Sequence, residues 1–207
     1  MLLVGVTGSI GMGKSTVAQM FKNHGYGVYN ADDTVHYIYE KDEEVIAKVE
    51  SKFPGSTKDG VVDRIALRDI LNKDPQKFRD LEQIVHPVTR NYQIMYINKL
   101  IEEGKSGCIL DIPLLFETGG EKYVDVSIVV TASEKTQQLR VVSERKVPLD
   151  VYNAIKSQQM PDREKLKKAD YIISTDGEIE KTKSEVKEIA AKIKLINPKA
   201  WNTFFNK

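Results

Sequence analysis

The sequence has 207 residues, 41% of them hydrophobic and 29% charged, which is typical of one compact α/β domain with small insertions. The formal net charge of +1 argues against a general nucleic-acid-binding protein, because such domains carry a basic excess. No stretch approaches the roughly 18 apolar residues that cross a membrane, and residues 1–6 lack the basic region of a signal peptide. The single cysteine, Cys108, excludes an intrachain disulfide. We therefore expect a protein of the reducing cytoplasm without membrane or nucleic-acid partners.

Short apolar runs alternate with helical patterns along the chain, which is typical of a parallel sheet with crossover helices. A glycine-rich loop follows the first run, and Lys14–Asn23 is predicted as a helix. A later helix is expected to run from its N-cap Ser133 through Arg145. The runs predicted as strands are residues 2–6, 26–29, 107–112, 124–131 and 171–174. The remaining late helices are predicted at 149–159, 163–168 and 179–196, before a tail, 201–205, that we expect to pack on the body.

Residues 31–103 lack any strong strand and are predicted to be mostly helical. A loop is expected from Pro54 to Gly60, and His86-Pro87 is expected to separate two helices, because a residue before proline avoids the α region. An insertion of this kind is typical of a substrate-binding cap rather than of a sheet. The predicted helices are residues 35–39, 43–53, 64–71, 75–85 and 87–103.

The segment Gly8–Ser15 fits the phosphate-binding pattern G-x-x-x-x-G-K-[ST] at every fixed position. Its glycines let the backbone turn N–H groups toward phosphate oxygens, and the N-terminus of the following helix adds partial positive charge. Lys14 can reach the β- and γ-phosphates, and the Ser15 hydroxyl can bind Mg²⁺. Because the match lies between a predicted strand and a predicted helix, we interpret it as a nucleoside triphosphate site rather than a chance glycine-rich loop.

Two acidic positions follow predicted strands, where ligands of open α/β sheets bind. Asp111 ends an apolar run; a carboxylate there can hold Mg²⁺, often through water, so a site role is favoured over a plain helix cap. Asp32 and Asp33 follow the second strand and could accept a proton from an attacking hydroxyl. The stretch Asn30–Asp33 is equally well explained as a helix N-cap cluster.

Arg140 and Arg145 lie on a predicted helix near the phosphate site. Arginines can neutralise charge on a transferring group, and a mobile segment can close over a nucleotide. The spacing of the two arginines by itself favours a solvated helix face. The lone histidine His86 is by itself more often a structural residue than a catalytic one.

The chain contains, in this order, Thr7–Thr16, Asn30–Asp32, Asp63-Arg64, Leu81-Glu82 with His86-Pro87, Asp111–Glu117, Gln159–Pro161 and Ala169-Asp170. In order and spacing, over about residues 3–193, these seven segments resemble the dephospho-CoA kinase family. The resemblance implies that ATP phosphorylates the 3′-hydroxyl of the ribose of dephospho-CoA, giving coenzyme A and ADP, in the last step of coenzyme A synthesis. Two of the segments, Asp111–Glu117 and Leu81-Glu82 with His86-Pro87, are much more specific than the phosphate loop.

The resemblance also implies a body of three parts. The first is a three-layer P-loop NTPase core with a five-stranded parallel sheet, formed by residues 1–30, 104–139 and 169–207. The second is a helical substrate-binding domain at about 31–103, and the third is a lid at about 140–168. ATP is the implied phosphoryl donor, Mg²⁺ the implied metal and dephospho-CoA the implied small-molecule partner; we expect a monomer.

Residue roles follow from the same resemblance. Asp32 matches the catalytic base, and Lys14 and Arg140 complete the catalytic set. The implied ATP-binding residues are Gly11, Met12, Gly13, Lys14, Ser15 and Thr16, with Mg²⁺ held through Ser15 and ATP. The implied substrate-binding residues are Asp32, Arg64, His86, Asp111 and Leu114.

Three positions depart from the family pattern. Asn30 stands where the family has an aspartate. Glu144 stands where the family often has an arginine, and the nearest arginine, Arg145, is one position later. Thr175 stands where the family has an asparagine, so the contacts to the adenine stay open. Two other functions share the phosphate loop: a different small-molecule kinase, and a guanine-nucleotide switch. The switch is disfavoured because Asn98-Lys99 is followed by Leu100-Ile101 rather than by the Asn-Lys-x-Asp pattern that guanine recognition needs.

Overall fold

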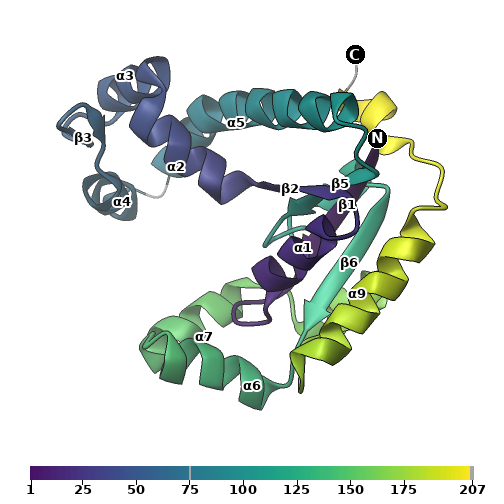
Figure 1. Cartoon of the computed structure of the whole chain (residues 1–207). Coiled ribbons are helices and arrows are strands. Elements are labelled where there is room, and N and C mark those ends of the chain that lie inside the picture. Colours follow the sequence, from purple (N-terminus) through teal and green to yellow (C-terminus); the bar gives the residue numbers. More distant parts are fainter. Residues whose placement is uncertain (75, 206–207) are drawn as a thin grey trace. The chain divides into compact units, whose positions relative to one another are not determined.

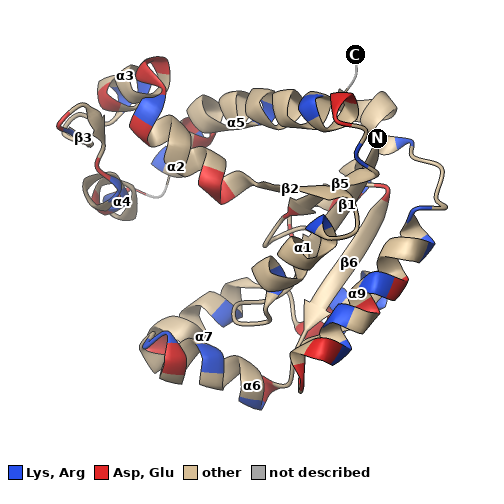
Figure 2. Ribbon diagram, in the orientation of Figure 1, with Lys and Arg blue, Asp and Glu red and all other residues tan. Residues whose placement is uncertain are grey.

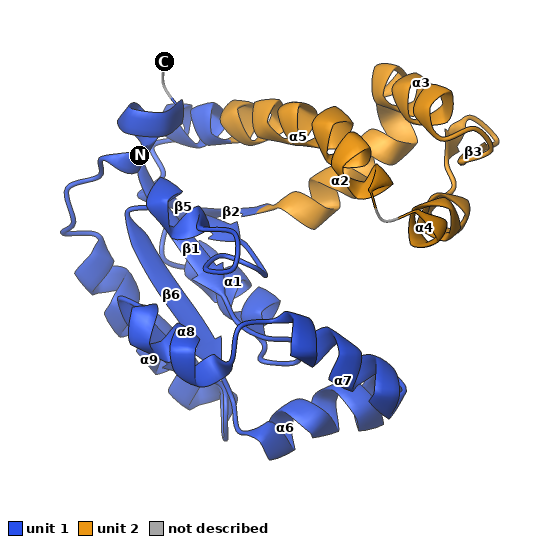
Figure 3. Cartoon of the chain, turned by 180° about the vertical axis from the view of Figure 1, so that it is seen from behind, with its two compact units in different colours: residues 1–29, 97–207 blue, residues 30–96 orange. Residues whose placement is uncertain are grey.

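The computed structural model describes residues 1–74 and 76–205, and over these the chain divides into two compact units (Figure 3). Unit 1 comprises residues 1–29 and the chain from Ile97 onward, and unit 2 comprises Asn30–Tyr96. The predicted start of one helix, Pro75, lies outside the described residues. None of the helices in the described ranges is long and apolar enough to cross a membrane.

Unit 1 is built on a parallel sheet, and across the described residues it has five strands in the order β2-β5-β1-β6-β7 (Figure 1). The central strand β1 pairs with β5 on one side and β6 on the other, so that Val4 lies opposite Ile109 and Val126. The five predicted strands are confirmed, each within two residues of its expected ends. Their bounds are Leu2–Thr7 for β1, Tyr26–Asn30 for β2, Gly107–Asp111 for β5, Val126–Thr131 for β6 and Tyr171–Ser174 for β7.

Both faces of this sheet are covered, which produces the predicted three layers. Side chains alternate across a strand, so the even-numbered residues of β1 and β6 share one face. That face packs on helices α1 (Lys14–Lys22) and α9 (Ile179–Ile193). On the other face, Val129 of β6 packs with Leu115, Phe116 and residues around helix α8 (Asp162–Lys168). Figure 2 shows acidic and basic residues mixed along α9, as expected for a helix with one buried face.

Cys108 lies inside this core. It is a free, buried thiol, and burial raises its pKa from 9.0 to about 12. The unfolded chain should therefore release the thiol proton above about pH 9 while the native chain keeps it, so stability should fall as pH rises from that point. We expect the wild type to lose more stability than Cys108→Ala between about pH 8 and 10 in urea unfolding. Equal losses in the two proteins would contradict this expectation.

The helical connections of unit 1 largely match expectation, with one correction. Ser133 caps helix α6 (Glu134–Gln138), because its hydroxyl accepts the N–H of Thr136. The helix was predicted to continue regularly through Arg145, but it widens into a π-helical stretch over Leu139–Glu144, where the Arg145 N–H donates to the carbonyl of Arg140. Such widened turns are frequent at functional sites. Helix α7 (Leu149–Gln158) follows, and a short 3₁₀ turn occupies Gly120–Tyr123.

The C-terminal tail packs on the body, as predicted. It forms a π-helical turn over Trp201–Phe205, and Trp201 is buried. The Asp125 carboxylate accepts the N–H groups of Lys199 and Ala200 on one oxygen and that of Leu3 on the other. This single side chain therefore ties the tail to β1.

Unit 2 has its own hydrophobic core. Helices α2 (Ala31–Lys41), α3 (Glu43–Lys52) and α4 (Arg64–Lys73), with the first part of α5 (Lys77–Glu102), supply it. Its largest fully buried side chains include Ile38 and Phe53. The remaining buried members are Tyr39, Val45, Val49, Val62, Leu67, Leu71 and Val85.

The predicted loop at Pro54–Gly60 is wrong in part, because it contains half of a small antiparallel hairpin. Strands β3 (Thr57–Lys58) and β4 (Val61–Val62) are joined by Asp59 and Gly60, both with positive φ. That backbone is typical of a two-residue hairpin turn. Strands of two residues are too short to produce an alternating pattern, so the sequence alone could not reveal them.

The predicted break at His86-Pro87 is also wrong, because α5 is one continuous helix with Pro87 inside it. The hydroxyl of Thr89 donates to the carbonyl oxygens of Val85 and His86, which adds side-chain bonds in the turn that contains the proline. Val85 and Val88 also pack into the unit 2 core. Tertiary burial of this face thus outweighs the local preference of a residue before proline.

Candidate active site

The phosphate loop, residues 8–13, connects the end of β1 to the start of α1. Gly11 and Gly13 have φ of 79° and 83°, a left-handed backbone that favours glycine. Between them, Met12 is buried in the core, and its sulfur accepts the N–H of Ala132 beyond β6. The loop is therefore anchored through Met12 while its two glycines make the turns that a phosphate cradle requires.

Asp111 lies beside this loop, because β5 pairs with β1 and Val6 is opposite Asp111. Lys14 forms an ion pair with one carboxylate oxygen of Asp111, and the Ser15 hydroxyl donates to the other at 3.3 Å. The Asp111 side chain is only 4% exposed, and the ammonium group of Lys14 pairs with it. The structure thus brings together three predicted site residues; their chemical roles remain predictions.

These groups fit a Mg²⁺ ion that is held mainly by a nucleotide. Mg²⁺ prefers oxygen ligands and, in kinases, takes only one or two from the protein and the rest from phosphates and water. Ser15 Oγ and the Asp111 carboxylate are such oxygens, side by side at the loop. Over residues 1–74 and 76–205, no group of three or more His, Cys, Asp or Glu side chains could hold a metal by itself.

Arg140 contacts the loop as well. Its Nη1 donates to the Thr175 hydroxyl at 2.8 Å and to the Gly11 carbonyl at 3.3 Å, and its Nη2 donates to the Thr175 carbonyl at 2.8 Å. The Thr175 hydroxyl in turn donates to the Met12 carbonyl at 2.8 Å. Sequence reasoning treated Thr175 only as a departure from a pattern, whereas its hydroxyl links Arg140 to the loop.

A cavity of about 220 Å³ opens beside these contacts in unit 1. Arg140, Arg145 and Thr175 line it together with the loop residue Gly13 and with Thr16 of α1. Arg145, whose place in the lid pattern was doubtful, therefore shares this cavity with Arg140. Leu114, the other predicted substrate residue of unit 1, is 40% exposed, and its carbonyl accepts the N–H and hydroxyl of Thr118.

Three further predicted site residues lie in unit 2. Asp32 is exposed in the first turn of α2, where Asn30 is the N-cap and accepts the Asp32 N–H at 2.9 Å. Arg64 is the first residue of α4, because Asp63 caps that helix. His86 is exposed on α5. The capping role therefore belongs to Asn30, and the proposed base role of Asp32 stays a prediction.

Arg64 lines a cavity of about 440 Å³ within unit 2. Its neighbours there are Arg68 on the next turn of α4, Tyr39 of α2 and Phe78 of α5. Sequence reasoning missed Arg68, although its spacing of four from Arg64 puts both on one face of a helix.

Gly11 should not tolerate a side chain. A Cβ there would lie 2.5 Å from a methyl of Val141 and 3.1 Å from the Gln137 carbonyl, on a backbone with φ of 79°. We expect Gly11→Ala to lower stability by more than the roughly 1–2 kcal/mol of left-handed strain, and to weaken ATP binding. Gly60→Ala is the matched control, because Gly60 has the same φ and no atom within 4 Å. Equal losses of urea midpoint in the two variants would refute the crowding at Gly11.

The model of the family described as dephospho-CoA kinase matches residues 2–181. A dephospho-CoA kinase of Rhodopseudomonas palustris is 42% identical over 91% of this chain and 94% of its own length. A solved structure from Thermus thermophilus has a TM-score of 0.81 at 31% identity, covering 95% of this chain and 98% of its own. The dephospho-CoA kinase structure from Campylobacter jejuni has a TM-score of 0.67 at 27% identity, covering 93% and 96%. This chain belongs to the dephospho-CoA kinase family.

Proposed function

We propose that this protein transfers the γ-phosphoryl group of ATP to the 3′-hydroxyl of the ribose of dephospho-CoA, giving coenzyme A and ADP. The observation that carries the proposal is the contact of Lys14 and Ser15 with Asp111. It joins the phosphate loop to the first residue of Asp111–Glu117, one of the two segments that resemble the family more specifically than the loop does. Membership of the family indicates the reaction, and this contact indicates which residues we assign to binding the phosphoryl donor.

On the donor side, positioning and charge neutralisation provide most of the acceleration, because phosphoryl transfer needs little covalent help. Lys14 exchanges its contact with Asp111 for the β- and γ-phosphate oxygens. Ser15 and Asp111 would hold Mg²⁺, and the ion would neutralise charge on the phosphates. The glycine turns at Gly11 and Gly13 direct backbone N–H groups to the same oxygens.

On the acceptor side, Asp32 orients the ribose hydroxyl and removes its proton. The family pattern assigns Arg64, His86 and Leu114 to acceptor binding. The cavity of unit 2 supports this assignment, because Arg64 and Arg68 line it among apolar residues and guanidinium groups pair well with phosphate oxygens. We assign the acceptor to the helical region 31–103 and the lid to residues 140–168.

Arg140 neutralises charge on the transferring phosphoryl group. Its bonds to Gly11 and Thr175 already hold its guanidinium against the phosphate loop. Gly13, Thr16 and Thr175 line the neighbouring cavity, which we assign to the nucleoside of ATP. Arg145 shares this cavity, and we assign it no catalytic step.

The reaction is tested by ADP release with a panel of acceptors and with ATP or GTP as donor. Dephospho-CoA with Mg-ATP should turn over, with coenzyme A identified by mass. Turnover of another acceptor without dephospho-CoA turnover would indicate a different small-molecule kinase on the same core. Hydrolysis of GTP in preference to ATP, without transfer to any acceptor, would indicate a nucleotide switch.

The expected monomer is checked by light scattering. We propose the cytoplasm as the location, because that compartment keeps thiols such as Cys108 reduced.

A further inference from the structure

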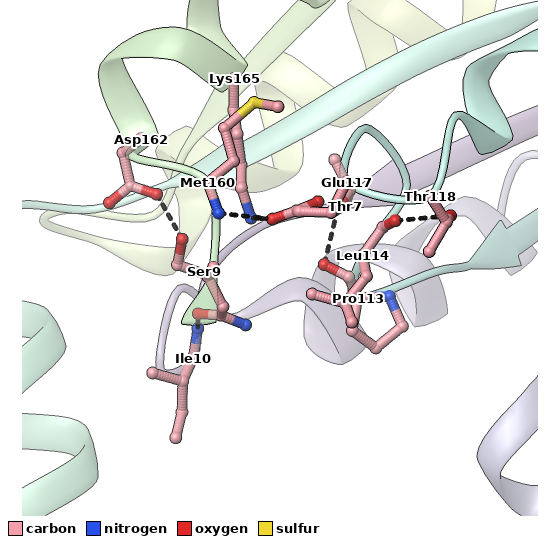
Figure 4. Close-up of polar contacts among 11 residues, drawn as sticks. Thr7, Ser9, Ile10, Pro113, Leu114, Glu117, Thr118, Met160, Asp162 and Lys165 are labelled. Atoms are coloured by element: carbon pink, nitrogen blue, oxygen red, sulfur yellow. Dashed lines mark hydrogen bonds and ion pairs between the residues drawn. The ribbon is translucent and has the colours of Figure 1, made fainter. Parts of the chain in front are cut away.

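The segment that follows α7, residues 159–165, binds both the phosphate loop and the Asp111–Glu117 segment (Figure 4). Gln159-Met160-Pro161 belongs to the family-like pattern of the sequence, yet the proposed mechanism gives it no task. Its contacts fall on the first half of the loop, which precedes the phosphate-binding residues Gly11–Thr16.

The loop residue Ile10 is held on both sides by glutamine side chains. Its N–H donates to Gln159 Oε1 at 3.0 Å, and its carbonyl accepts from Gln137 Nε2 at 2.7 Å. Gln137 is buried, and its own oxygen accepts the hydroxyl of Tyr152 at 3.0 Å. The preceding residue, Ser9, donates its hydroxyl to Asp162 Oδ1 at 2.5 Å. The polar backbone groups of Ile10 are thus occupied by one side chain from α6, in the predicted core, and by one from the predicted lid.

A buried ion pair supports the Gln159 side of this arrangement. Lys165 is fully buried, and its ammonium lies 3.0 Å from Glu117 Oε1. The same oxygen accepts the Met160 N–H at 2.7 Å, one residue beyond Gln159 (Figure 4). Burial opposes ionisation of Glu117, but the ammonium group of Lys165 and the N–H of Met160 outweigh it and lower the pKa of Glu117. Glu117 is therefore an anion that fixes the backbone next to Gln159.

The geometry of the loop explains why such bonds would matter. Gly11 follows Ile10 directly and has a left-handed backbone, so the direction of the next N–H groups depends on the Ile10 peptide. A phosphate cradle is effective when its donors are fixed before the ligand arrives. Neither glutamine is one of the six residues assigned to the phosphates, so each acts on ATP only through the loop.

We propose that Gln137 and Gln159 are positioning residues that hold the first half of the phosphate loop in its ATP-binding shape, and that the Glu117–Lys165 pair keeps Gln159 in place. The proposal rests on the proposed use of ATP but not on the identity of the acceptor. ATP affinity is therefore measured by calorimetry without any acceptor, so a failure of the dephospho-CoA assignment would leave this test intact.

The first experiment compares Gln159→Leu, Gln159→Glu and Gln158→Leu. Gln159→Leu removes the acceptor of the Ile10 N–H, and we expect ATP to bind roughly tenfold more weakly, as for one lost hydrogen bond to a buried group. Gln159→Glu keeps an acceptor oxygen and should bind ATP within about twofold of the wild type. Gln158 is the exposed neighbour, so Gln158→Leu should be silent. The pair Gln137→Leu and exposed Gln138→Leu repeats the comparison at the carbonyl of Ile10.

Measuring both the melting temperature and the ATP affinity of Gln159→Leu separates a purely structural role from a positioning role. If Gln159→Leu lowers the melting temperature but leaves ATP affinity unchanged, the glutamine only stabilises the fold and the proposal is wrong. The KM for the acceptor should stay unchanged in Gln159→Leu, because the altered atoms contact the loop alone. An equal loss of ATP affinity in Gln158→Leu would also overturn the assignment.

The second experiment tests the ion pair by a double-mutant cycle. Glu117→Gln with Lys165→Met removes both charges together, so no buried charge is left unpaired. If the ion pair acts through Gln159, the triple variant that also carries Gln159→Leu should bind ATP no more weakly than the weaker binder of the two parents, the double variant and Gln159→Leu. Independent, additive losses would show that Glu117 and Lys165 do not act through Gln159, and would overturn that part of the proposal.

Discussion

Asp32→Asn is expected to lower kcat by on the order of 10² or more, which is typical for the loss of a general base. The amide keeps the size of the side chain and its place in the first turn of α2, but it cannot accept the proton of the ribose hydroxyl. ATP binding should be unaffected, because Lys14, Ser15 and the glycine turns supply the phosphate contacts. Steady-state kinetics with dephospho-CoA, together with calorimetric ATP binding, measure both quantities.

Asp33→Asn is the matched control for this substitution. Asp33 is adjacent, exposed and in the same first turn of α2, so it has the same favourable interaction with the helix N-terminus. Its loss should leave kcat nearly unchanged. A reduction of less than about threefold in Asp32→Asn, or an equal reduction in Asp33→Asn, would exclude Asp32 as the base.

Lys14→Ala is expected to damage ATP binding and kcat together. A charge-assisted contact to phosphate oxygens contributes about 1.5–3 kcal/mol, so kcat/KM for ATP should fall at least about tenfold. The variant should also be less stable, because the Asp111 carboxylate, with its side chain 4% exposed, loses the ammonium group that pairs with it.

Two variants separate these effects at Lys14. Lys14→Ala combined with Asp111→Asn removes the unpaired charge, so thermal stability should recover while ATP binding does not. Lys22→Ala, at the exposed far end of the same helix, removes an equal charge and should change neither property. Recovery of ATP affinity in the double variant would show that Lys14 acts only by neutralising Asp111.

Local patterns in the sequence were sufficient for the core of the fold. The five strands are contiguous apolar runs, and the phosphate loop is a contiguous motif with glycines where the backbone has positive φ. Asp111 could be expected near that loop because the carboxyl ends of parallel strands share one edge. Such features depend on neighbouring residues, so a short stretch of sequence contains them completely.

Packing overruled local preference at two places. Pro87 lies inside α5 because the helix buries Val85 and Val88 in the unit 2 core. The hairpin at Thr57–Val62 forms although its strands are two residues long, and the Glu50 carboxylate accepts the N–H groups of Gly55 and Thr57 at its start. In both cases the deciding contacts come from residues outside the short segment on which the prediction was based.

The sequence by itself determined that this protein has a triphosphate-binding loop on a parallel α/β core, and which residues are candidates for its chemistry. Only the tertiary structure decided which side chains hold that loop in place. Asp111 is 97 residues from Lys14, Gln159 is 149 from Ile10, and Thr175 is 163 from Met12. These bonds depend on the order and register of the strands, and no periodicity within a single element encodes that arrangement.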